Sequence, residues 1–190
     1  MGAMMKRLLA SVVLLWALPA HALEVAGVNV ADKVTVGAGE LALNGAGIRT
    51  RAIFKVYVAA LYLAERKSGA AEALALPGAK RVAITLLRDL SAQQLIEAFD
   101  DGIKANSSAA ELEALKARVA ELLSLFADAK KGDVILLDYL PGTGTGVSLN
   151  GAPKGKPIQG DDLYRAVLRI WLGDRPVDGD LKKGMLGQAQ

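Results

Sequence analysis

Residues 44–66 read Asn-Gly-Ala-Gly-Ile-Arg-Thr-Arg-Ala-Ile-Phe-Lys-Val-Tyr-Val-Ala-Ala-Leu-Tyr-Leu-Ala-Glu-Arg, and they are the most informative part of the chain. A glycine-rich turn leads into a long apolar segment, which predicts one extended strand that begins with arginine side chains. Successive strand residues point to opposite faces of a sheet. The apolar face carries Ile48, Ala52, Phe54, Val56 and Val58. The opposite face mixes cations with apolar groups, at Arg49, Arg51, Ile53, Lys55 and Tyr57. That mixture is typical of the wall of a cleft that holds an amphipathic anion.

The segments on either side alternate between strand and helix patterns. Strands are predicted over 24–30, 33–36, 40–43, 80–88, 133–140 and 147–150. Helices are predicted over 91–105, 108–127, 160–172 and 179–186, with a short helix or turn over 68–76. Capping boxes at Ser91 and Ser108 define the starts of two of these helices. The pattern predicts one α+β domain in which helices cover a large antiparallel sheet.

The first 22 residues have the pattern of a signal peptide. Lys6 and Arg7 precede an apolar run over 8–18, and Ala20-His21-Ala22 offers a small-x-small cleavage site. The run is shorter than the ~20 residues that a membrane-spanning helix needs. Cleavage after Ala22 would leave a single domain over 23–190, exported to the periplasm or secreted. A retained membrane anchor is the alternative.

The composition excludes several kinds of chemistry from that mature domain. His21 is the only histidine, and the chain has no cysteine. Without imidazole or thiol there is no Ser-His-Asp triad, no cysteine nucleophile and no Cys/His zinc site. No metal and no cofactor are therefore predicted, and the sequence gives no positive sign of a haem or another flat cofactor. Removing Lys6 and Arg7 leaves 21 basic against 20 acidic residues, so nucleic acid is not an expected partner.

Two side chains are candidates for contact with a ligand. Arg49 can grip a carboxylate through two parallel hydrogen bonds, which strengthen where water is excluded. Its alternative is an exposed cation at the start of a strand. Tyr57 lies on the same predicted strand face, about 26 Å away in an extended strand at ~3.3 Å per residue. Both could serve one pocket only if the strand bends or the ligand is long. For Trp171, packing in the core is favoured over stacking on a ligand. For residues 142–146, a hairpin turn is favoured over a phosphate-binding loop.

Several short motifs together resemble the bacterial branch of the chalcone isomerase-like proteins. They are Leu43-Asn-Gly-Ala-Gly-Ile-Arg49, Tyr57-Val-Ala-Ala-Leu-Tyr62-Leu, Arg88-Asp-Leu-Ser-Ala92, Lys131-Gly-Asp133, Asn150-Gly151 and Ile170-Trp-Leu-Gly173. The resemblance covers essentially the whole mature chain in a consistent order. It implies an open-faced β-sandwich, a large antiparallel sheet layered with helices around an apolar cleft. Plant relatives in this family include true chalcone isomerases and non-catalytic fatty-acid-binding proteins.

The resemblance also assigns positions to the functional residues of the family. Arg49 matches the arginine that meets a developing oxyanion in the enzymes and a carboxylate in the binders. Tyr57 matches a position where the enzymes use threonine. With no gaps assumed, Leu95 replaces the enzymes' tyrosine, Gly102 falls near their asparagine, and Tyr164 falls near their late Ser/Thr.

These replacements favour binding over catalysis. Leu95 cannot donate a hydrogen bond, and the loss of one positioned donor can cost ~10²–10³ in rate. The leading hypothesis is a non-catalytic binding protein for a fatty acid or a similar amphipathic carboxylate, with Arg49, Tyr57, Leu95 and Tyr164 as ligand-binding residues. One alternative is an isomerase, or intramolecular lyase, that acts on a phenolic enone through Arg49, Tyr57 and Tyr164. A second alternative is a protein-interaction module of the cell envelope, which would have a filled core and no cleft.

Overall fold

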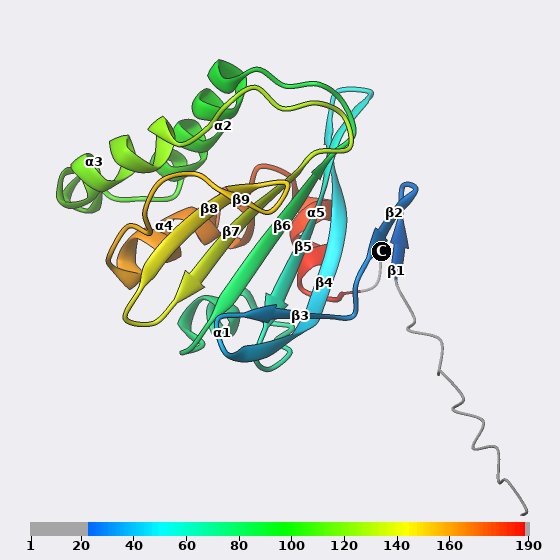
Figure 1. The fold of residues 1–190 in the computed structure, drawn as a ribbon, viewed down its shortest axis with the longest axis horizontal. Helices are drawn as coiled ribbons and strands as arrows, with labels where there is room; N and C mark the ends of the chain where they lie inside the picture. Colours follow the sequence, from blue (N-terminus) through cyan, green and yellow to red (C-terminus); the bar gives the residue numbers. More distant parts are fainter. Residues whose placement is uncertain (1–22, 189–190) are drawn as a thin grey trace, which may run out of the picture.

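A curled antiparallel sheet of seven strands forms the centre of the structure, a computed structural model that describes residues 23–188 (Figure 1). The strands lie in chain order from edge to edge: β3 (Lys33–Val36), β4 (Gly39–Arg51), β5 (Phe54–Leu63), β6 (Lys80–Leu86), β7 (Val134–Leu140), β8 (Gly144–Leu149) and β9 (Ala152–Pro153). A separate hairpin pairs β1 (Leu23–Val25) with β2 (Val28–Val30). The predicted signal peptide, residues 1–22, lies outside the described residues.

Five helices accompany the sheet in the described part of the chain. They are α1 (Ala70–Ala75), α2 (Ala92–Ala105), α3 (Ala109–Ser124), α4 (Asp161–Leu172) and α5 (Gly179–Met185). The predicted α+β class, with helices layered on an antiparallel sheet, is confirmed. The capping boxes at Ser91 and Ser108 are formed as predicted, since each serine side chain accepts the backbone N–H three residues later. None of the helices over 23–188 is both long and apolar enough to cross a membrane.

The prediction of one long strand after Ile48 is wrong, because the chain reverses at Ala52-Ile53. Arg51 pairs with Phe54 across a two-residue turn, and β4 and β5 run antiparallel on either side of it. The turn contains none of the usual turn residues Gly, Pro, Asn or Asp. Ala52 instead adopts a φ of 54°, in the left-handed region that non-glycine residues rarely enter. Arg49 and Tyr57 therefore become direct cross-strand neighbours instead of distant residues of one strand.

The predicted glycine turn over 44–47 is also wrong, since these residues lie inside β4. A Cβ on Gly45 would lie 2.2 Å from the carbonyl oxygen of Gly184, so the glycine allows α5 to pack directly on the strand. The buried Asn44 side chain fixes the end of the same helix, because its amide donates 2.8 Å to the carbonyl of Met185. These glycines therefore permit close packing between two elements far apart in sequence.

The two faces of the sheet bury different clusters. Towards α2 and α4, β5 contributes Tyr57, Ala59, Leu61 and Leu63 to the larger core. Towards the β1–β2 hairpin it contributes Val58, Ala60 and Tyr62 to a smaller cluster. The alternation is the period of two expected for a strand buried on both faces. The larger core extends to the end of the sheet where β4, β5 and β6 face α2, and the candidate site lies there.

Candidate functional site

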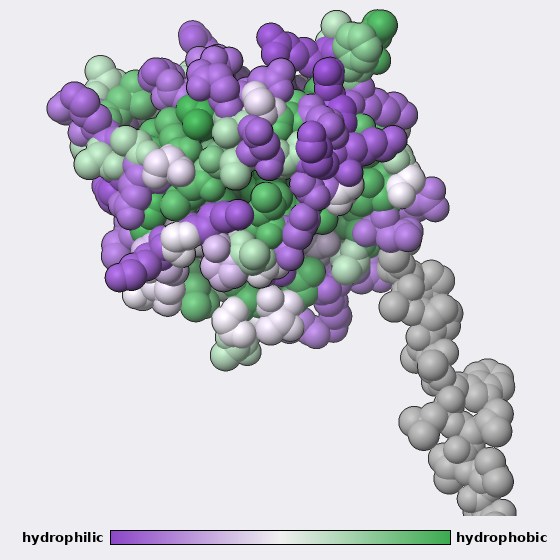
Figure 2. All heavy atoms as spheres, turned by 45° about the horizontal axis from the view of Figure 1, so that its top comes forward, coloured by the Kyte–Doolittle hydropathy of each residue, from purple (hydrophilic) through white to green (hydrophobic). Residues whose placement is uncertain are grey.

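A cavity of about 610 Å³ lies between α2 and the end of the sheet formed by β4, β5 and β6. Its apolar lining includes Val56, Ile84, Leu95 and Phe99, all buried side chains of the larger core. Its rim is charged, with Arg51, Arg88 and Arg175 near Glu97 and Asp101 of α2. Figure 2 shows this end of the molecule, where charged and polar groups border apolar surface. A cavity with apolar walls and few polar groups is the common form of a small-molecule site.

A β-bulge directs two consecutive residues of β5 toward the cavity. Arg49 pairs with Tyr57 but Thr50 pairs with Lys55, so Val56 is the extra residue. Val56 and Tyr57 accordingly both belong to the larger core, and both line the cavity. Bulges often re-aim side chains next to functional sites. The regular alternation predicted for this strand placed Val56 and Tyr57 on opposite faces, and it is wrong at this point.

Arg49 is half-buried at the cavity wall and has no hydrogen-bond or salt-bridge partner within residues 23–188. The Nε atom is buried and makes no hydrogen bond within the part of the chain that the structure describes, and the guanidinium forms no salt bridge there. Its Cζ lies 5.9 Å from the centre of the Tyr57 ring, which is within the range of a cation–π contact. Buried charges are normally paired. The unpaired guanidinium is therefore suited to receive an anion.

Asp178, an acidic residue that contacts the neighbour of Arg49 in β4, is already occupied by backbone donors. Asp178 accepts the N–H of Thr50 at 3.0 Å through Oδ2 and caps α5 through Oδ1, which accepts from the N–H groups of Asp180 and Leu181. A carboxylate that accepts three backbone N–H groups is held in place by them. Asp178 therefore anchors the start of α5 next to Arg49 and forms no salt bridge with it within the described residues.

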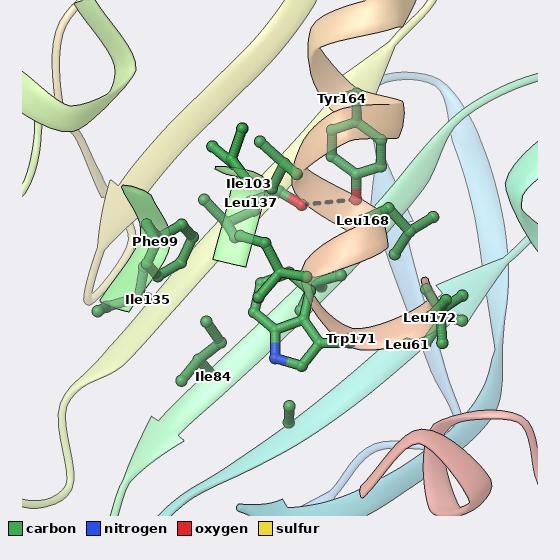
Figure 3. Close-up of a cluster of buried hydrophobic side chains, with 14 of the residues drawn as sticks. Leu61, Ile84, Phe99, Ile103, Ile135, Leu137, Tyr164, Leu168, Trp171 and Leu172 are labelled. Atoms are coloured by element: carbon green, nitrogen blue, oxygen red, sulfur yellow. Dashed lines mark hydrogen bonds between the residues drawn. The ribbon is translucent and has the colours of Figure 1, made fainter. Parts of the chain in front are cut away.

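Tyr57 is fixed by a buried tryptophan below the cavity. The indole N–H of Trp171 donates to the Tyr57 hydroxyl at 2.9 Å, and the Trp171 ring packs edge-to-face on Phe99 at 5.7 Å. Figure 3 shows Trp171 surrounded by core side chains. Core packing of Trp171, favoured from the sequence, is confirmed. Burial raises the pKa of Tyr57 to about 12, although the charge of Arg49 opposes this shift. Tyr57 therefore stays protonated at neutral pH and can donate its hydroxyl hydrogen to a ligand.

Because Tyr57 and Tyr164 are buried, we expect the free energy of unfolding to fall in alkali. The unfolded chain releases the Tyr57 proton near pH 10, while the folded protein holds it to about pH 12. The stabilisation is therefore complete below about pH 10 and is lost as the pH rises through 12, at up to ~3 kcal/mol from Tyr57. Burial also raises the pKa of Tyr164, which steepens the loss. Urea unfolding at several alkaline pH values should show this slope, with a shallower slope in Tyr57→Phe. An equal slope in both proteins would contradict the assignment.

Two further predicted positions line the cavity. Leu95 presents an apolar side chain from the first turn of α2, and Gly102 lies two turns later on the same helix. A Cβ on Gly102 would lie 2.8 Å from Cγ2 of Ile170. The glycine thus permits close packing of α2 on α4, and a larger residue would require Ile170 or the helices to shift. Neither position offers a hydrogen-bonding side chain to a ligand.

The structure does not bring Tyr164 to this cavity. Tyr164 is fully buried on α4, about two turns before Trp171, and its hydroxyl donates 3.1 Å to the carbonyl of Leu137 (Figure 3). Its partner is the central sheet, and it does not line the cavity. The comparison with the family's enzymes, made without gaps, therefore assigned a ligand-binding role to a residue of the core. Trp171, on the same helix, reaches the site indirectly through Tyr57.

Sequence reasoning missed much of the lining. Phe99 and Ile84 carry core-type signals that do not distinguish a cavity wall from packed interior. Arg88 and Arg175 follow a strand and a helix, at loop positions whose place in space depends on the whole fold. No group of three or more acidic or metal-binding residues lies close enough to hold a metal ion within residues 23–188. The arrangement can bind an amphipathic anion by charge and by apolar contact.

Comparisons with known proteins agree with this architecture. A family model described as chalcone isomerase-like matches residues 22–187. The crystal structure of an Arabidopsis thaliana fatty-acid binding protein superposes with a TM-score of 0.66 at 15% sequence identity, covering 87% of this chain and 96% of that protein. That likeness shows the fold. No curated protein matches the sequence significantly.

Proposed function

The chain belongs to the chalcone isomerase-like family, and from that premise we propose that it is an exported, non-catalytic binding protein for a fatty acid or a similar amphipathic carboxylate. The acyl chain lies along the apolar walls of the cavity, and the carboxylate meets Arg49. The similar fold of a protein described as fatty-acid binding supports the choice of ligand class.

The observation that carries the proposal is the buried Nε of Arg49, which has no hydrogen-bond partner within the described chain. Leaving a buried donor unsatisfied costs about 1–3 kcal/mol, and more when the group is charged. A bound carboxylate would remove that cost and form a charge-assisted hydrogen bond. Tyr57, protonated at neutral pH, is positioned across the strand pair as a second donor. The positive charge at Arg49 selects an anionic group, and the apolar lining of the rest of the cavity selects an acyl chain.

The cavity residues favour binding over the isomerase alternative. Leu95 and Gly102 line the cavity at the positions where the resemblance predicts the tyrosine and asparagine of the family's enzymes, and neither side chain can hydrogen-bond. The high pKa of Tyr57 also makes it a poor proton donor or acceptor at neutral pH. Cyclisation of a chalcone above its spontaneous rate, abolished by Arg49→Ala, would favour the enzyme alternative. The envelope-interaction alternative predicts a filled core, and the cavity counts against it.

Native mass spectrometry of the protein recovered from the periplasmic fraction of producing cells tests the export and the ligand together. The polypeptide mass should correspond to a chain that begins at Leu23, because cleavage is predicted after Ala22. A second series should carry the added mass of a bound carboxylic acid, released on denaturation and identified in the organic extract. A polypeptide that retains residues 1–22 would contradict export. A protein without bound acid that also fails to take up added palmitic acid would contradict the ligand.

A further inference from the structure

The tip of the β4–β5 hairpin exposes two large apolar side chains. Ile53 is 86% exposed and Phe54 is 57% exposed, whereas Leu23, at 44%, is the only other large hydrophobic residue so exposed within residues 23–188. The tip extends beyond the sheet in Figure 1, and Figure 2 shows an apolar projection in the same region. Exposed apolar residues gathered at one point of a surface mark an interaction site more often than scattered single ones.

The backbone holds these side chains outward. The turn has only two residues, and Ala52 occupies the left-handed region at a φ of 54°. Backbone strain of this kind is unfavourable and concentrates at functional sites. Because both strands are paired up to Arg51 and Phe54, the apolar tip is presented by a rigid element.

Cations surround the apolar tip. Arg51 and Lys55 flank it on the two strands, and Arg88 lies over the Phe54 ring with its Cζ 5.6 Å from the ring centre. All three are exposed, and none forms a salt bridge within the described chain. The acidic groups at this end are separate from the tip, since Glu97 and Asp101 belong to the opposite cavity wall on α2. Asp89 is paired with Lys130.

The same residues form the mouth of the cavity. Arg51, Ala52, Phe54 and Arg88 line it together with Arg49. A surface bound at the tip would therefore lie beside the entrance through which a ligand must pass.

The geometry points to docking of this tip on an anionic lipid bilayer. Ile53 and Phe54 enter the boundary between headgroups and acyl chains, while Arg51, Lys55 and Arg88 contact lipid phosphates. Two side chains at the end of a hairpin offer far less than the ~800 Å² per partner that a stable protein interface buries. Insertion into a membrane needs no matching surface and uses both the apolar and the cationic groups. This proposal goes beyond the proposed function, because docking does not require that the cavity bind an acid.

Site-specific labelling tests the docking, since the chain has no cysteine. An environment-sensitive fluorophore on Ile53→Cys should become brighter with phosphatidylglycerol vesicles and should be quenched by lipids that carry spin labels in their acyl chains. The matched control is Glu40→Cys, an exposed position near the other end of β4. Its fluorophore should not respond. Both proteins carry the same N-terminus, so a difference between them reports the tip and not residues 1–22.

Charge and apolar variants separate the contributions. Arg51→Gln with Lys55→Gln should weaken binding to phosphatidylglycerol vesicles about tenfold or more, and added salt should weaken wild-type binding similarly. Ile53→Ser with Phe54→Ser should weaken it at least about tenfold. Equal responses at positions 53 and 40, equal binding to phosphatidylcholine, or self-association that disappears in the Ser variants would overturn the proposal. Uptake of fatty acid in vesicle-free solution is measured separately, so failure of docking and failure of ligand binding are distinguishable.

Discussion

Replacing Gly45 with alanine should destabilise the protein by about 3 kcal/mol or more. The new Cβ would lie 2.2 Å from the carbonyl oxygen of Gly184 and 2.6 Å from the backbone nitrogen of Gly187. Both contacts are with backbone atoms, so no side-chain rotation relieves them. The end of α5 and the residues after it would have to move away from β4. Leu181 and Met185 of this helix, both fully buried, would then lose core contacts.

Gly39→Ala in the same strand is the matched control. The nearest atom to a Cβ at Gly39 is 3.7 Å away, an ordinary contact, and its φ is not positive. We therefore expect a change in the free energy of unfolding within about 0.5 kcal/mol. Urea unfolding of both variants, followed by circular dichroism, measures the difference. Similar stabilities for the two variants would show that α5 does not pack on β4 as described.

Displacement of α5 should also change the position of Arg49 in the cavity wall. Asp178 caps this helix and accepts the N–H of Thr50, the residue after Arg49 in β4. The helix, the strand and the candidate anion site are therefore joined by one side chain. The glycines at 45 and 47 and Arg49 therefore belong to one arrangement. The glycines allow α5 to approach β4, and Asp178 at the start of α5 holds the part of β4 that carries Arg49.

Much of the fold was predictable because its signals are local. The capping boxes at Ser91 and Ser108, and the end of α4 before Gly173, were identified at the correct residues. The strand predicted over 80–88 is β6, in which Val82, Ile84 and Leu86 alternate as buried side chains. Each of these features depends on residues within one or two turns of the chain.

The errors occurred where distant residues decide the local structure. The structural role of Gly45 is its close contact with Gly184, about 140 residues later in the chain. No pattern near Gly45 indicates this contact. The turn at Ala52-Ile53 is fixed by strand pairing, since neither residue favours a turn by itself. A short polar turn would have been recognisable. An apolar turn has the same pattern as a continuous strand.

The candidate site was predicted in its residues more than in its geometry. The sequence indicated Arg49, Tyr57 and Leu95, and the structure brings all three to one cavity. The predicted separation of Arg49 and Tyr57 was wrong because the intervening turn was missed. Tyr164 was placed by counting along the helix, and the structure shows that the count reaches the core below the sheet instead of the cavity. The same ungapped correspondence gave Leu95 and Gly102, which line the cavity, and Tyr164, which does not.

Replacing Arg49 with methionine should weaken binding of a fatty acid by about ten- to a hundredfold, which corresponds to the roughly 1.5–3 kcal/mol of a hydrogen bond to a charged group. Methionine keeps apolar contact with the Tyr57 ring but removes the positive charge. Binding of the methyl ester of the same acid should be unchanged, because the ester has no charge to lose. Arg49→Lys should retain part of the preference for the acid, since lysine keeps the charge without the planar pair of donors.

Arg51→Met is the matched control, because Arg51 lines the same cavity from an exposed position. Its effect on the acid in vesicle-free solution should be less than about threefold, since an exposed charge is screened by water. Arg49→Met should also leave the free energy of unfolding unchanged or raise it, because the wild-type guanidinium is partly buried without a hydrogen-bond or salt-bridge partner in the described part of the chain. Fluorescence titration with the acid and its ester, and urea unfolding of each variant, measure these effects. Equal losses for acid and ester, or a loss of stability that accounts for the loss of binding, would show that Arg49 supports the fold and does not hold the ligand.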